Sequence, residues 1–123
     1  IQNVRGNKHF VSMQLNKWLK QFQNIQFVSD VCHYDFVLLI DLITNGGTAL
    51  DLPVNISAVC HDINQDIAQH FHISNHRAFN MSREDTMSYI CDKKDFVEGD
   101  KHNSLYDAKV IQAIWKGINN KRA

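Results

Sequence analysis

The sequence has no excess of charge of either sign and few of the residues that divide a chain into parts. Lysine plus arginine and aspartate plus glutamate each total 13, so no overall positive field predicts a nucleic-acid or membrane partner, although a neutral enzyme can still bind nucleic acid at a local site. Proline occurs once and glycine five times in 123 residues, and no repeat, low-complexity tract or linker is present. The length and the 44% hydrophobic content therefore predict a single domain over residues 1–123.

Long apolar runs and paired cysteines are also missing. No run is long enough to span a membrane, and no stretch has the charged, apolar and small-residue pattern of a secretory leader. Cys32, Cys60 and Cys91 are an odd number in separate apolar contexts, which is typical of free thiols in a reducing compartment. These absences predict a cytoplasmic protein with no membrane partner.

Helical and strand patterns alternate along the chain. Apolar residues at the helical period predict helices over residues 10–22, 35–44, 63–71, 82–90 and 104–118. The second of these is apolar on nearly every side until Asn45, Gly46 and Gly47 stop it, which predicts a buried helix with a glycine C-cap. Runs rich in β-branched residues predict strands at 25–32 and 55–60, and the stretches 72–80 and 93–101 are typical of loops. The alternation predicts an α/β layer fold with helices on a sheet.

The last predicted helix carries an aspartate among its apolar residues. Counted from Ser104, one face of the helix holds Asp107 together with three isoleucines: Ile111, Ile114 and Ile118. A carboxylate aimed at the core is costly unless it meets a donor, an opposite charge or a metal ion. The alternative is a capping box, in which Ser104 accepts a backbone N–H and Asp107 reaches back to the serine N–H.

A second aspartate has the same kind of position. Asp35 comes just after the first predicted strand, at the head of an apolar stripe that includes Leu39 and Leu42. An acid at a helix N-terminus is ordinary by itself, because the helix dipole favours negative charge there. The recurrence favours a shared role for Asp35 and Asp107. If both helices begin at the same edge of the sheet, the two carboxylates would converge where ligands of open α/β sheets bind.

Histidines and cysteines give a weaker prediction of a zinc site. Adjacent residues on a strand point to opposite faces, and residues two apart on a helix do not face one another. No pair has the spacing of a tetrahedral zinc site. The pairs considered are Cys32 with His33, Cys60 with His61, and His70 with His72.

Two stretches resemble motifs of a known enzyme class. SDVCHYDFVLL (29–39) and HNSLYDAKVIQAIW (102–115) resemble the second and third motifs of the DEDDh class of 3′–5′ exonucleases, the ribonuclease T-like branch of the ribonuclease H-like fold. The third motif is the more specific: a histidine, four residues and an aspartate at the start of the last helix, usually followed by alanine, matched by His102, Asp107 and Ala108. The second, an aspartate after an aromatic or apolar residue at a helix start, is matched by Tyr34 and Asp35. With the element order, the resemblance covers nearly the whole chain and implies a mixed sheet with flanking helices.

The resemblance implies a metal-dependent 3′–5′ exonuclease that acts on single-stranded nucleic acid, RNA in preference to DNA, and releases nucleoside 5′-monophosphates. In the class, four acids hold two divalent cations, Mg²⁺ or Mn²⁺, and the histidine is the general base for the attacking water. It therefore implies that Asp35 and Asp107 are metal ligands and that His102 is the base. Members of the class often form dimers, so a homodimer is expected.

The first motif of the class is missing from this sequence. An aspartate and a glutamate one residue apart on the first strand normally precede everything seen here, and Asp30 cannot replace them. Because the sequence begins with Ile1 and a predicted helix, we expect residues 1–123 to be the C-terminal part of a DEDDh domain, inactive alone, whose sheet edge pairs with its missing N-terminal segment or with a second copy. The alternative function is a non-catalytic nucleic-acid-binding or assembly module that keeps the fold with an incomplete site.

Overall fold

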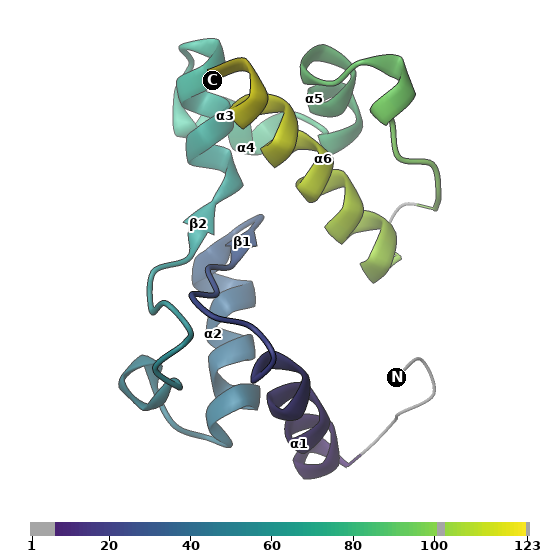
Figure 1. Cartoon of the computed structure of the whole chain (residues 1–123). Coiled ribbons are helices and arrows are strands. Elements are labelled where there is room, and N and C mark those ends of the chain that lie inside the picture. Colours follow the sequence, from purple (N-terminus) through teal and green to yellow (C-terminus); the bar gives the residue numbers. More distant parts are fainter. Residues whose placement is uncertain (1–6, 101–102, 123) are drawn as a thin grey trace. The chain divides into compact units, whose positions relative to one another are not determined.

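The computed structural model describes residues 7–100 and 103–122. It is a mixed α/β structure in which helices predominate over a small two-stranded parallel sheet (Figure 1). The chain forms two compact units, Ile1–His61 and Asp62–Ala123. The predicted mixture of helices and strands is confirmed, whereas the ribonuclease H-like sheet and the single domain stay predictions.

The first unit holds two helices and a short parallel pairing. Its elements are α1 (Lys8–Leu19), β1 (Val28–Ser29), α2 (Cys32–Thr44), the 3-10 turn η1 (Ala49–Asp51) and the start of β2 (His61–Asp62). A parallel bridge joins Ile25 to Ile56, and the backbone N–H of His61 donates to the carbonyl of Phe27 at 2.9 Å. The pairing therefore lies near the two predicted strands, but the paired segments are only two residues long.

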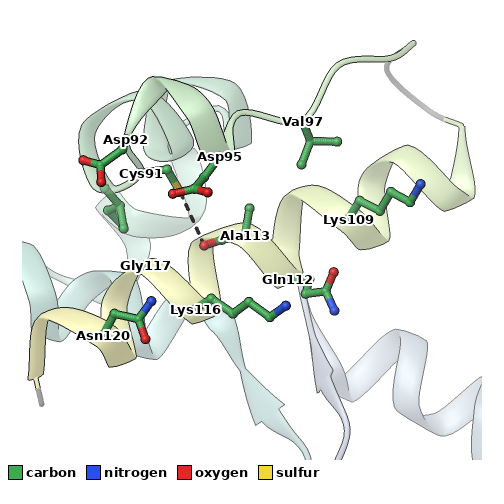
Figure 2. A pocket seen from close by; sticks show the side chains of 11 residues that line it. Cys91, Asp92, Asp95, Val97, Lys109, Gln112, Ala113, Lys116, Gly117 and Asn120 are labelled. Atoms are coloured by element: carbon green, nitrogen blue, oxygen red, sulfur yellow. Dashed lines mark hydrogen bonds between the residues drawn. The ribbon is translucent and has the colours of Figure 1, made fainter.

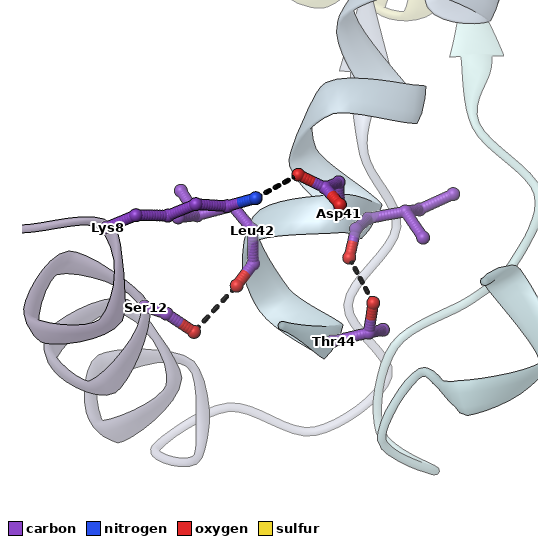
Figure 3. Close-up of polar contacts among 6 residues, drawn as sticks. Lys8, Ser12, Asp41, Leu42 and Thr44 are labelled. Carbon is purple, nitrogen blue, oxygen red and sulfur yellow. Dashed lines mark hydrogen bonds and ion pairs between the residues drawn. The ribbon is translucent and has the colours of Figure 1, made fainter. Parts of the chain in front are cut away.

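Helices α1 and α2 lie side by side in the first unit (Figures 1 and 3). Polar contacts join them: Lys8 forms an ion pair with Asp41, and the hydroxyl of Ser12 donates to the carbonyl of Leu42 at 2.6 Å. Ser12 is buried, so this hydrogen bond satisfies a hydroxyl that would otherwise be desolvated without a partner. The apolar contacts between these elements centre on three buried residues: Leu19, Ile43 and Ile56.

Helix α2 ends on an asparagine and not on a glycine. Asn45 takes a left-handed conformation with φ 58°, and its N–H donates to the carbonyl of Asp41. Gly46 follows with φ 95°. The predicted glycine C-cap at Gly46 and Gly47 is therefore wrong by one residue, because asparagine also tolerates the left-handed conformation that ends a helix.

Helix α2 is also not buried on every side. Phe36 and Ile43 are its buried residues, whereas Val37 and Leu38 are 56% and 55% exposed. Within the unit, α1 and β1 contact the helix. The prediction of a helix buried all round is wrong for the described part of the chain, because apolar composition alone does not supply a partner for each face.

The second unit is helical. Helix α6 (Ser104–Arg122) contacts α3 (Ile63–Phe71) and α5 (Arg83–Ile90), and α3 contacts α4 (Asn75–Asn80), as Figure 1 shows. The 3-10 turn η2 (Lys93–Asp95) follows α5. The predicted helices at 63–71, 82–90 and 104–118 are confirmed. The largest fully buried aliphatic side chains described in this unit are Ile63, Ile67, Ile90, Val110, Ile114 and Ile118.

The stretch 72–80 contains a helix, so its prediction as a loop is wrong. Ser74 caps α4 with its side-chain oxygen, which accepts the backbone N–H of Arg77 at 3.1 Å. Ala78 is fully buried and packs this short helix into the unit. The helix has six residues and mostly polar side chains, which is too few for a hydrophobic period to reveal it.

The cysteines and the lengths of the helices bear on the cellular compartment. Cys32, Cys60 and Cys91 are free thiols, as predicted, and all three are partly buried. Among residues 7–100 and 103–122, no helix has both the length and the apolar character needed to cross a membrane. The cytoplasmic localisation stays a prediction.

Gly117 allows α6 to approach α5 closely. A Cβ at this position would lie 2.6 Å from Cγ2 of Ile90, which is 1% exposed and cannot move aside. At an ordinary position inside a helix, alanine is more stable than glycine by about 1 kcal/mol. Forcing a methyl group into a packed core, however, costs about 1–3 kcal/mol. We therefore expect Gly117→Ala to lower the free energy of unfolding by about 1 kcal/mol, measured by urea unfolding followed by circular dichroism.

A second substitution isolates the cause of this effect. Ile90→Ala removes the methyl group that the new side chain would meet, so Gly117→Ala should no longer destabilise the protein when it is introduced into Ile90→Ala. An equal loss of stability in both backgrounds would show that the contact with Ile90 is not the reason for the glycine.

Candidate active site

Asp107 lies in the first turn of α6 with its side chain exposed to solvent. The buried part of the helix begins at Val110 and continues through Ile114 and Ile118. The helical period does place Asp107 on this face, but the packed part of the face starts one turn later along the chain. The prediction of a buried, inward-aimed carboxylate is therefore wrong, and the Asp107 oxygens are open to solvent.

The N-cap of α6 is Asn103. Its side-chain oxygen accepts the backbone N–H groups of Leu105 and Tyr106 at 3.1 and 3.2 Å, and its carbonyl accepts the N–H of Asp107 at 2.9 Å. Ser104 is consequently the first residue of the helix, and the predicted capping box of Ser104 with Asp107 is wrong. Among the described residues, the carboxylate of Asp107 forms no hydrogen bond and no ion pair. Asp107 is therefore neither a buried carboxylate with a partner in the core nor a member of a capping box.

Tyr106 anchors the same helical turn. Its ring lies against Gly99, where a Cβ would come within 2.6 Å of the ring. Desolvation, followed by the negative charge of Glu84, raises the pKa of Tyr106 above its ordinary value of 10.0, with a smaller contribution from Asp107. The raised pKa means that ionising Tyr106 costs more in the folded protein than in the unfolded chain, so stability is retained below pH 10.0 and falls as the pH rises further. Asp107 therefore follows a tyrosine whose ring packs against Gly99.

Asp35 has the equivalent position in α2. Counted from Cys32 and from Ser104, Asp35 and Asp107 are each the fourth residue of their helix. Asp35 is exposed, and its carboxylate also forms no hydrogen bond or ion pair within residues 7–100 and 103–122. Both carboxylates lie in the first turn of their helix, near the positive end of the helix dipole.

A strained residue precedes α2, and the sequence does not reveal it. Val31 is left-handed, with φ 64° and ψ 66°, and its carbonyl accepts the N–H groups of Tyr34 and Asp35 at 3.1 and 3.2 Å. This conformation is rare for a β-branched residue and costs about 1–3 kcal/mol. Val31 makes the sharp turn from β1 into α2 and so sets where Asp35 begins its helix. A glycine or asparagine here would have signalled the turn, but valine gives no signal.

The predicted metal site depends on residues that the structure does not bring together. Asp35 belongs to the first unit and Asp107 to the second, and His102 lies outside the described residues, so the convergence of the three stays a prediction. In the described part of the chain, no group of three or more histidines, cysteines or acids could hold a metal ion. Exposed carboxylates without other partners are suitable oxygen ligands for Mg²⁺ or Mn²⁺. Each of the two acids offers oxygen ligands to such an ion, and their membership of one site stays a prediction.

Comparisons with known proteins found no relative of this chain. No family model matches the chain, no curated protein matches it and no solved structure matches it. Support for a function therefore comes from the two motifs and from the local geometry of their acids.

Proposed function

We propose that the chain is the C-terminal part of a metal-dependent 3′–5′ exonuclease domain of the DEDDh class, which acts on single-stranded RNA. The third motif carries this proposal: His102, Asp107 and Ala108 have the spacing of the class, and Asp107 lies in the first turn of the last helix with an exposed carboxylate. The order α1, β1, α2, β2 and then helices agrees with the order of elements that the resemblance implies.

Three side chains of this chain have a role in the proposed reaction: Asp35, Asp107 and His102. Asp35 and Asp107 hold divalent cations, Mg²⁺ or Mn²⁺, together with the acid pair of the first motif. Bound cations supply the positive charge that stabilises the attacking and the leaving oxygen of the phosphodiester. His102 accepts the proton of the attacking water, and a nucleoside 5′-monophosphate is released from the 3′ end. The exposure of both carboxylates supports this assignment, since their oxygens are open to ligand binding.

Residues 1–123 by themselves should show no exonuclease activity. They contain only two of the four acids that the class uses, so two cations cannot be held and the leaving oxygen cannot be stabilised. We expect no release of mononucleotides from a labelled single-stranded oligoribonucleotide with Mg²⁺ or Mn²⁺. The complete protein, with a strand that carries an acid pair upstream of Ile1, should degrade the same oligonucleotide from its 3′ end.

Two results would contradict these expectations in different ways. Robust manganese-dependent degradation by residues 1–123 alone would show that the site does not need the first motif. A complete protein that is folded but inactive with both metals, or a coding sequence with no acid pair upstream of Ile1, would rule out the exonuclease. The non-catalytic binding or assembly module would then be the better proposal.

A further inference from the structure

A pocket with a volume of about 440 Å³ lies in the second unit, between α6 and the segment that follows α5 (Figure 2). Its apolar wall includes Ile90, Val97 and Ala113. Polar side chains also line it: Asp92 and Asp95 come from the segment after α5, and Lys109, Gln112 and Lys116 come from α6. This volume is within the range of about 300–1,000 Å³ that small-molecule sites have. Asp35 and Asp107 do not line it.

The pocket carries both signs of charge on opposite sides. Lys109 and Lys116 are seven residues apart, which places them two turns apart on the same face of α6. Asp92 and Asp95 are the acidic counterparts, and within the described residues none of these four side chains forms an ion pair. A ligand that brings a negative group to the lysines and N–H donors to the carboxylates would form charge-assisted hydrogen bonds at both ends.

We propose that this pocket binds a guanine mononucleotide. The phosphate would bind to Lys109 and Lys116, and the face of the base would cover the apolar wall. Guanine presents two adjacent donors, N1–H and the exocyclic amino group, and an ionised carboxylate such as that of Asp92 or Asp95 accepts both. Adenine presents an acceptor beside its donor, and an acceptor would repel a carboxylate. The proposal does not depend on nuclease activity, because no proposed catalytic residue among those described lines the pocket.

The test is a calorimetric titration of the protein with guanosine 5′-monophosphate in the absence of divalent cations. We expect saturable binding to one site, with adenosine 5′-monophosphate and inorganic phosphate each at least about tenfold weaker, because each lacks one of the two sets of hydrogen bonds. Lys116→Met, and Asp92→Asn combined with Asp95→Asn, should each weaken the binding of guanosine 5′-monophosphate about tenfold. All three residues are exposed, so the fold should tolerate these changes.

Two control variants separate this pocket from other sources of binding. Lys94→Met removes an exposed lysine of η2 that does not line the pocket and should leave the affinity unchanged. Asp107→Asn should also leave it unchanged, which distinguishes the pocket from the proposed active site. The proposal would be overturned by absent saturation at millimolar nucleotide, by equal binding of the adenine nucleotide, or by full affinity in both the lysine and the aspartate variants.

Discussion

His102→Ala should lower the turnover of the complete protein by roughly two to four orders of magnitude, the usual contribution of a positioned general base. In the proposed mechanism the imidazole takes the proton of the attacking water, and alanine leaves no group of suitable basicity in its place. The fold and the binding of Mg²⁺ should stay nearly intact, because the histidine is not a ligand in this proposal. The measurement is kcat on a single-stranded oligoribonucleotide, with Mg²⁺ affinity determined by calorimetry on the same samples.

His76 provides the matched control for this prediction. It is an exposed histidine of α4, and its ring is hydrogen-bonded to the side chain of Asn80 at 3.1 Å. His76→Ala should leave kcat close to that of the unchanged protein. Added imidazole should restore part of the activity of His102→Ala, which a purely structural role would not permit. A loss of less than about tenfold in His102→Ala would show that the histidine is not the general base.

The sequence predicts α3, α5 and α6 of the second unit, but it misses α4 and does not predict where the packing of these helices ends. The periodic positions Val110, Ile114 and Ile118 are buried, and Asp107 shares their face by helical geometry. Its exposure depends on where the neighbouring helices stop, which is a tertiary property that no local period contains. The sequence does not predict which residue is the N-cap of α6, because Asn103 and Ser104 are adjacent and both are good N-cap residues.

The first unit is less predictable because its strands are short. Runs of β-branched residues predict strands of six or more residues, but β1 and β2 pair over only two residues each. A strand ends where its partner ends and where the backbone turns, and here the left-handed Val31 turns it. Strand propensity describes how well a side chain fits a sheet surface and not how long the pairing lasts. The position of Asp35 in the first turn of α2 was predictable, but the expectation that it points toward the core is wrong because it is exposed, and its convergence with Asp107 stays a prediction.

Asp107→Asn should lower nuclease activity and Mg²⁺ affinity together in the complete protein, by at least about a hundredfold. Even partners in the outer shell of a metal site contribute about 10–100-fold, and Asp107 is proposed as a direct ligand. Asparagine keeps the size of the side chain but removes the charge that a hard cation requires. Metal-free stability should stay level or rise, because relief of repulsion between neighbouring carboxylates offsets the lost interaction with the helix dipole. Calorimetry with Mg²⁺ and thermal unfolding in a chelator measure the two effects.

Asn103→Ala is the matched control, because it changes the same helix terminus without touching a proposed metal ligand. The side chain of Asn103 accepts two backbone N–H groups, so its loss should lower metal-free stability by about 1 kcal/mol. Mg²⁺ affinity should be nearly unchanged in this variant. The two variants should therefore show opposite patterns: Asp107→Asn loses Mg²⁺ affinity and keeps its metal-free stability, whereas Asn103→Ala loses stability and keeps its Mg²⁺ affinity. If Asp107→Asn instead lowered metal-free stability by about 1 kcal/mol and left Mg²⁺ affinity unchanged, Asp107 would be a structural residue of the helix terminus, and the exonuclease proposal would lose its most specific motif.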